Sequence, residues 1–228
     1  MIKKLFTWLV LPLCIIALTY AIVDSIMQPV RFNKEKDYRE GIAVQRLKDI
    51  RTLQVAFKSV NNRFASTLDS LKDFYNTGEM SVIMQVGSKD DSLAMIHTEA
   101  VKKANKKITS TDLYQMYMAG DKNLVFSVEN KIPVKDTLFN GREDFNIDDI
   151  DIIPFSGGET IIMDAIIKPV SGVQVPLFEA KIPYKALLKG LDNQLRINLD
   201  ADRRDQNKYE GLQVGSITAP NNNAGNWE

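Results

Sequence analysis

The sequence has little of what most metal centres and disulfide frameworks are built from. It contains one cysteine, Cys14, and one histidine, His97, among 228 residues. A single thiol excludes an intramolecular disulfide, and one thiol with one imidazole cannot supply the ligands of the usual zinc sites. We therefore predict no metal site and no cofactor, and we interpret His97 as a surface residue.

Neither sign of charge is in excess, because 29 lysine and arginine residues balance 29 aspartate and glutamate residues. Nucleic-acid binding depends on a surplus of positive charge, so we expect no nucleic-acid partner. Glycine-rich phosphate loops, Gly-x-Ser-x-Gly nucleophile turns and metal-ligand spacings are missing too. No catalytic residue and no small-molecule substrate can be assigned from the sequence. A hydrolase or carbohydrate-acting domain that uses carboxylates remains the alternative to a binding or structural role.

What the sequence does have is an apolar run near its start. Leu5–Val23 comprises nineteen consecutive residues without a charge, enough to cross a bilayer as a helix. Two lysines precede the run, and its length exceeds the apolar core typical of a cleaved signal peptide. We therefore predict a short cytoplasmic end at 1–4 and an uncleaved transmembrane signal anchor at 5–27. Cleavage after Ala21 is the minor alternative.

A juxtamembrane segment and a helical stalk are predicted at 28–76. Pro29 predicts a break or kink near Gln28, since the residue before a proline avoids the helical conformation. Beyond it, Tyr38–Phe64 has a helical period and forms a long amphipathic helix that closes at Asn61-Asn62-Arg63. The apolar face of this helix comprises Ala43, Leu47, Ile50, Leu53, Phe57, Val60 and Phe64.

This apolar stripe supplies most of the candidate interaction residues. We favour packing against the chain's own domain over an intermolecular seam, because two consecutive steps of three residues break the heptad register of a coiled coil. A tryptophan in the polar tail, 218–228, is a further candidate, since docking into a groove is the alternative to a mobile tail. The candidates are Leu47, Ile50, Leu53, Phe57, Val60 and Trp227.

The range 77–217 predicts a head of short helices and antiparallel strands. A short helix at Leu68–Phe74, capped by Ser66 or Thr67, leads into it. Further helices are predicted at Ser92–Lys107 and Tyr184–Asn193, and the alternation of Leu195, Ile197 and Leu199 favours a short strand or turn.

Most of the predicted strands lie in the second half of the head. Strands are predicted at Met80–Val86, Leu124–Val128, Lys131–Leu138, Ile150–Phe155, Thr160–Lys168, Val175–Ile182 and Leu212–Ile217. The strands that begin at Ile150, Thr160 and Val175 are joined by short turns and form a three-stranded meander. The predicted fold class is therefore α+β, with an N-terminal transmembrane helix, a long amphipathic helix and an antiparallel-sheet head.

An acidic turn at Asp144–Asp151 imitates the opening of a calcium-binding EF-hand loop. Asp149, however, occupies the position of the invariant glycine, and Phe155 stands where the bidentate glutamate is needed. A solvated acidic loop is therefore the better interpretation.

Two resemblances to known proteins can be stated on these residues. The run Asp49–Phe57, followed by Asn62-Arg63-Phe64 and by Ser66–Leu71, resembles the stalk-to-head passage of type IV pilins and type II secretion pseudopilins. The glycine at which prepilins are cleaved is replaced by Leu5, so this kind of processing is not expected. With its ending GLQVGSITAPNNNAGNWE, the whole chain resembles a family of bacterial single-pass membrane proteins to which no activity is assigned.

The resemblances imply a place and a role. They suggest a single-pass protein of the bacterial inner membrane whose bulk is periplasmic. By analogy with pilin-like and alignment-complex proteins, we expect a structural or interaction subunit of a cell-envelope assembly. The expected partners are the membrane itself and either other envelope proteins or further copies of the chain.

Overall fold

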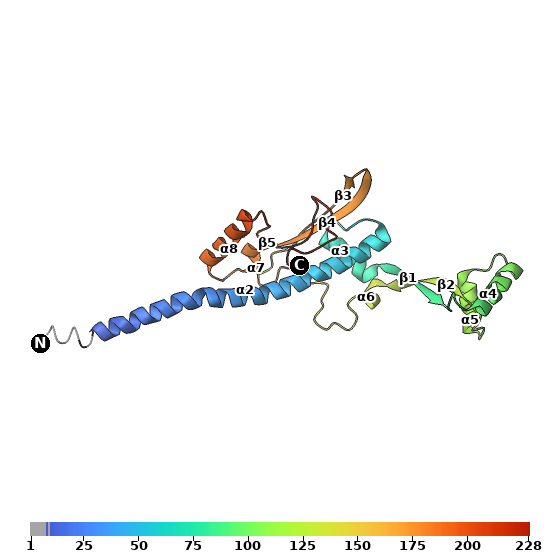
Figure 1. Ribbon diagram of the computed structural model, residues 1–228, viewed down its shortest axis with the longest axis horizontal. Coiled ribbons are helices and arrows are strands. Elements are labelled where there is room, and N and C mark those ends of the chain that lie inside the picture. Colours follow the sequence, from blue (N-terminus) through green and yellow to red (C-terminus); the bar gives the residue numbers. More distant parts are fainter. Residues whose placement is uncertain (1–7, 9) are drawn as a thin grey trace.

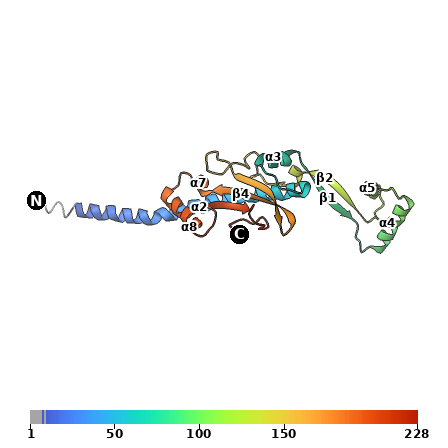
Figure 2. The ribbon, with the colours of Figure 1, turned by 90° about the horizontal axis from the view of Figure 1, so that it is seen from above.

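The computed structural model describes residue 8 and residues 10–228, and it combines helices with small antiparallel sheets, as predicted. The predicted cytoplasmic end at 1–4 and the first residues of the predicted anchor lie outside the described residues. The molecule is elongated (Figure 1 and Figure 2). One long helix runs from the N-terminal end, a head packs on its second half, and a hairpin carries a small lobe at the opposite end.

The long helix, α2, spans Leu11–Asn61, which is 51 residues or about 76 Å at 1.5 Å per residue. Pro12 lies in its first turn, where the missing amide proton costs nothing. The break predicted near Gln28 is wrong, because Pro29 lies inside a continuous helix. A proline removes one hydrogen bond from an interior turn, and here the helix continues on both sides of it. The helix ends, as predicted, where Asn62 adopts the left-handed conformation (φ 55°).

The head is built around α2, the short helix α3 and a three-stranded sheet. Helix α3 (Leu68–Thr77) begins at Thr67, whose hydroxyl accepts a hydrogen bond from the amide of Ser70, as the predicted cap requires. The sheet contains β3 (Ile162–Val170), β4 (Val173–Pro183) and β5 (Gly211–Gly215), in the order β3-β4-β5 with all pairs antiparallel.

The predicted three-stranded meander is right in its hairpin and wrong in its first strand. β3 and β4 match the second and third predicted strands, but Ile150–Phe155 is a turn region with one isolated bridge, between Ile152 and Thr160. Phe155 has a left-handed backbone (φ 62°), which ends any extended run there. The third strand of the sheet is β5, which overlaps the predicted Leu212–Ile217 strand and begins one residue before it.

Two predictions between β4 and β5 also need correction. The helix expected at Tyr184–Asn193 is only the single turn α7 (Tyr184–Leu187), because a second helix, α8 (Asn193–Asp205), begins where Asp192 caps the amide of Leu195. The strand or turn expected from the alternation of Leu195, Ile197 and Leu199 is therefore helical. Leu195 and Leu199 also stand four residues apart, and both pack against the core of the head.

The distal lobe consists of β1 (Glu79–Val86), β2 (Phe126–Pro133), α4 (Ser92–Ala104) and α5 (Ser110–Met118). It has its own core of Val86, Leu113, Leu124, Phe126 and Val128, separate from that of the head. The two strands expected at Leu124–Val128 and Lys131–Leu138 are one strand, β2, followed by α6 (Val134–Thr137). α5 was not predicted.

Candidate functional site

The structure places the predicted interaction residues of the stripe in different environments. Leu47, Ile50 and Leu53 are fully buried in the core of the head. Phe57 is half-buried at the edge of the same core, and Val60 is 44% exposed. The stripe therefore packs against the chain's own domain, which leaves its centre inaccessible to a partner while the head is folded.

Trp227 is docked, and the C-terminal tail is ordered around it. The side chain packs against the core of the head, directly over Gly225, where a Cβ atom would lie 2.3 Å from the indole ring. Glu228 forms an ion pair with Arg51 of α2 (Oε1–Nη1 2.6 Å). Within the described part of the chain, the buried indole Nε1 has no hydrogen-bond partner. Docking on its own domain is therefore the arrangement of this tryptophan.

The two edges of the three-stranded sheet differ. The tail covers the β5 edge, since the amide of Gly215 donates to Ala224 (3.0 Å) and the amide of Asn226 donates to Gln213 (2.9 Å). Among the described residues, β3 pairs with β4 alone, and its large side chains Ile162, Ile166 and Ile167 are 56%, 37% and 56% exposed. The β3 edge is thus open and apolar, which is the usual condition of a strand that pairs with another chain.

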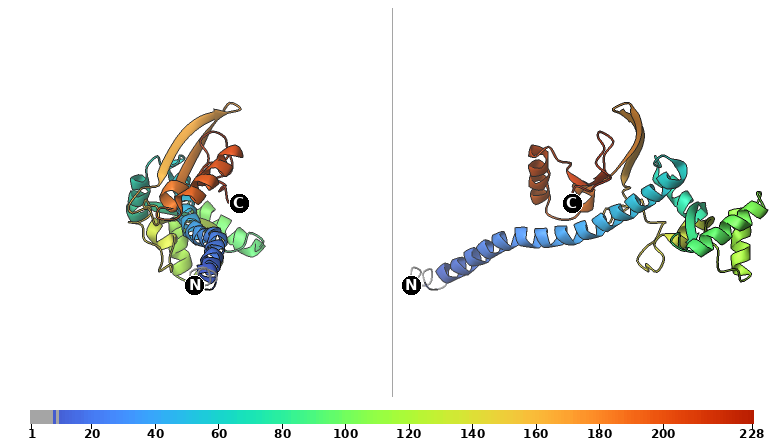
Figure 3. Two further views of the ribbon diagram at one scale, coloured as in Figure 1. Left: turned by 90° about the vertical axis from the view of Figure 1, so that its left-hand side faces the viewer. Right: turned by 45° about the vertical axis from the view of Figure 1, so that its right-hand side comes forward.

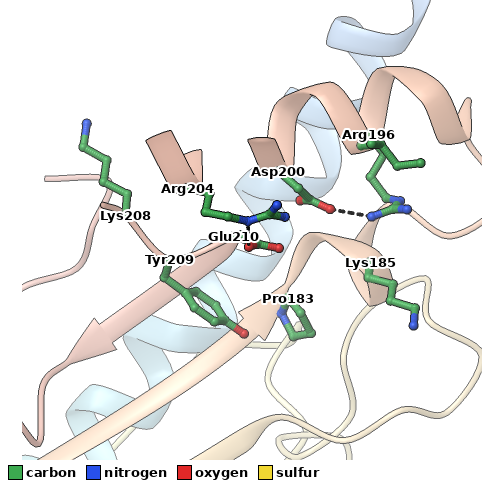
Figure 4. A pocket seen from close by; sticks show the side chains of 9 residues that line it. Pro183, Lys185, Arg196, Asp200, Arg204, Lys208, Tyr209 and Glu210 are labelled. Atoms are coloured by element: carbon green, nitrogen blue, oxygen red, sulfur yellow. Dashed lines mark hydrogen bonds and ion pairs between the residues drawn. The ribbon is translucent and has the colours of Figure 1, made fainter. Parts of the chain in front are cut away.

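A hollow of about 650 Å³ lies beside α8 and the adjoining ends of β4 and β5 (Figure 4). Two ion pairs line it. Arg196 binds Asp200 within α8, and Arg204 binds Glu210 just before β5 (Nε–Oε1 2.7 Å). Two further cations, Lys185 and Lys208, stand at its rim and point outward.

The environment moves the pKa values of these groups in different directions. Burial raises the pKa of Asp200, although Arg196 counteracts part of this effect, and one oxygen of this carboxylate is buried without a partner among the described residues. The hydrogen bond from Arg204 lowers the pKa of Glu210. Burial and nearby carboxylates raise the pKa of Tyr209 to about 12.

Two carboxylates with opposite pKa shifts are the pattern of an acid–base pair. Here, however, each carboxylate is held by an arginine, and the Asp200 side chain is only 9% exposed. The Arg204–Glu210 pair holds α8 against the start of β5, and the Arg196–Asp200 pair lies within α8, so both pairs serve the structure of the head. The hollow therefore gives no specific support to the carboxylate-using hydrolase considered from the sequence.

Other polar residues singled out from the sequence also serve local structure. His97 is exposed on α4, as predicted, and its Nε2 lies 2.8 Å from Asp121 Oδ2. In the acidic turn, Asn146 donates to Asp149 (2.9 Å). No group of three or more potential metal ligands is found within the described residues.

Sequence reasoning missed two buried polar contacts of α2. Asp49 is buried and binds Arg142 (2.6 Å), and the buried amide of Gln54 exchanges hydrogen bonds with the backbone of Ala65 (2.8 and 2.9 Å). A signal was present for Gln54, which stands four residues after Ile50 and therefore on the same face of the helix. For Asp49, no sequence signal indicates that its partner lies 93 residues away.

Comparisons with protein-family models, with curated proteins and with solved structures find no match to this chain.

Proposed function

We propose that this chain is a membrane-anchored structural or interaction protein of the bacterial cell envelope, with its head on the extracytoplasmic side. The observation that carries the proposal is the division of α2. By length and composition α2 is able to cross a membrane, and no residue of its most apolar window is buried. Its second half is built into the core of the head.

The first contacts of the head with α2 support the same arrangement. Gln28, directly after the proposed span, hydrogen-bonds the Asp192 carboxylate at the start of α8. Arg39 donates to the backbone oxygens of Leu187 (3.2 Å) and Lys189 (2.9 Å). The head would then stand directly on the membrane surface, fixed to a single helix without a flexible linker.

The proposal is tested by membrane extraction together with topology reporters. We expect the full chain to stay in the membrane pellet after an alkaline carbonate wash. A periplasm-active phosphatase fused after Glu228 should be active, while a cytoplasm-active fluorescent protein in the same position should be dark. A soluble chain, or the reverse reporter pattern, would contradict the proposed topology. Purification in detergent as a monomer without any co-purifying protein would contradict the interaction role.

A further inference from the structure

The open edge of β3 has backbone groups free to pair, and the hairpin register identifies them. Ser171 and Gly172 form a two-residue turn with φ of 50° and 83°, so the flanking residues Val170 and Val173 exchange both of their backbone hydrogen bonds. The backbone amides and carbonyls of the even-numbered residues of β3 therefore point toward β4. The odd-numbered residues direct their backbone amides and carbonyls to the open edge.

Three odd-numbered residues matter for pairing: Met163, Ala165 and Ile167. Within the described chain, the amides of Met163 and Ile167 have no protein partner, and the amide of Ala165 is bound by the carboxylate of the neighbouring Asp164 (2.8 Å). Pro169 is also an odd-numbered residue of β3. A proline is tolerated where the backbone nitrogen points to the open edge, because no hydrogen bond to β4 is lost there. The hairpin also projects beyond the body of the head (Figure 3).

A groove of about 330 Å³ runs beside this edge. On one side it is lined by Ala165, Ile166 and Ile167. Consecutive residues of a strand point to opposite faces of the sheet, so a hollow that touches all three lies along the strand edge. The opposite wall is the turn between α2 and α3, with Phe64 and Arg63 among its residues.

The composition of the groove defines what it can hold. Phe57, Phe64 and Ala165 offer apolar surface, while Ser66 and Ser70 add hydroxyl groups. The positive charge comes from Arg63, which lines the groove, and from Lys58, whose Nζ lies 5.0 Å above the Phe64 ring. An extended backbone beside β3 would place alternate side chains in this groove, and a carboxylate there would meet Arg63.

We propose that the β3 edge and its groove bind an extended, acidic segment of a partner protein, which adds to the sheet as a fourth strand. The same sheet already holds an extended segment on its other side, where the C-terminal tail covers β5. Asp164 caps one edge amide in the absence of a partner, a device that limits indiscriminate strand pairing. This inference rests on the proposed function, because it names the class of partner that an interaction protein of this kind would bind.

Fluorescence anisotropy with a labelled peptide tests the proposal on the full chain in lipid nanodiscs. The probe is a short peptide in which valine and threonine alternate around a central glutamate, with both ends blocked. We expect saturable binding to protein-loaded nanodiscs and none to empty ones. Methylation of the amides along one edge of the peptide should weaken binding at least about tenfold, because alternate amides face β3. Methylation along the other edge should have little effect.

Variants of the protein provide the second arm. Ile167→Pro removes an outward amide without touching the β3–β4 ladder and should weaken binding at least about tenfold, whereas Ile167→Val keeps the amide and should not. Arg63→Gln should abolish the preference for the glutamate peptide over its glutamine counterpart. Should Ile167→Pro fail to fold, the methylated peptides still decide the question on the unaltered chain.

Absence of saturable binding, or binding that ignores both amide methylation and Ile167→Pro, would overturn the inference. These outcomes are distinct from failure of the proposed function. If the chain is anchored with the predicted topology but does not bind the peptide, only the proposed strand-addition site is refuted. If the chain is found in the soluble fraction, the proposed membrane anchoring is refuted, whatever the peptide binding.

Discussion

The two halves of α2 are parts of one helix, yet they meet different surroundings. The first half, up to Arg31, is mostly apolar and exposed, with Ile16 at 68% and Leu13 at 67%. From Phe32 onward the helix buries one face, and Ile50 is fully buried. A helix that is apolar all round requires an apolar solvent, whereas one with a single stripe requires a partner along that stripe. The width of the apolar surface therefore indicates the medium each half needs.

The sharpest test of this comparison introduces the same charge into each half. Ile50→Asp places a carboxylate in the core of the head and should cost about 4 kcal/mol or more, which is enough to unfold many domains of this size. Ile16→Asp should leave urea unfolding of the head unchanged while lowering the fraction of chain that resists carbonate extraction. Equal loss of head stability in both variants would contradict the division of α2.

The two tryptophans extend the comparison. Trp227→Ala should destabilise the head by about 2–3 kcal/mol, since the indole is partly buried against the core. Trp227→Phe should cost less, because the ring is retained and the unpartnered Nε1 is removed. Trp8→Ala is the matched control, since this side chain is 84% exposed and lies outside the head. Urea unfolding of the three variants measures the effect, and a destabilised Trp8→Ala head would contradict it.

The stripe and the caps could be predicted from sequence because they are local. Leu47, Ile50 and Leu53 recur at helical spacing, and Thr67 stands one residue before an amphipathic turn, so periodicity and capping identified both. The capping box of Thr109 and Asp112 was an equally local signal for α5 and was overlooked.

Other features depend on residues far apart in the chain. Leu195, Ile197 and Leu199 fit a strand and a helix equally well, and the packing of Leu195 and Leu199 against the core of the head favours the helix. The open edge of β3 was not predictable either, because it depends on β5 and the tail covering the opposite edge. Sequence pattern thus gave the elements of the head more readily than the order of strands that creates the candidate binding site.

Ion pairs in the two halves of α2 should differ in the same way. Asp49 is buried and bound by Arg142, so Arg142→Met leaves an uncompensated buried carboxylate and should cost about 2 kcal/mol. In the exposed half, Arg31 pairs with Asp24, and both side chains are at least half exposed. Arg31→Met should therefore leave the urea midpoint of the head unchanged. A larger effect at Arg31 than at Arg142 would show that the head depends on the exposed half.

The smallest expected effect concerns the pH dependence of the tail. The hydrogen bond from Arg51 lowers the pKa of the Glu228 carboxyl below its ordinary 4.5. Because the folded pKa is the lower one, the contribution of this pair to tail docking is complete above 4.5 and is lost as the pH falls through the lowered folded value.

Fluorescence of Trp227 in a Trp8→Phe background follows this loss directly. We expect the emission to shift toward that of a solvent-exposed indole only at pH values below 4.5. Arg51→Gln should largely remove this pH dependence, because without the Arg51 hydrogen bond the pKa of the carboxyl differs little between the docked and the free tail. Arg31→Gln, in the exposed half of α2, should leave the transition where it is. A tail that undocks at the same pH in all three proteins would show that packing of the indole alone, without the Arg51–Glu228 pair, holds it on the head.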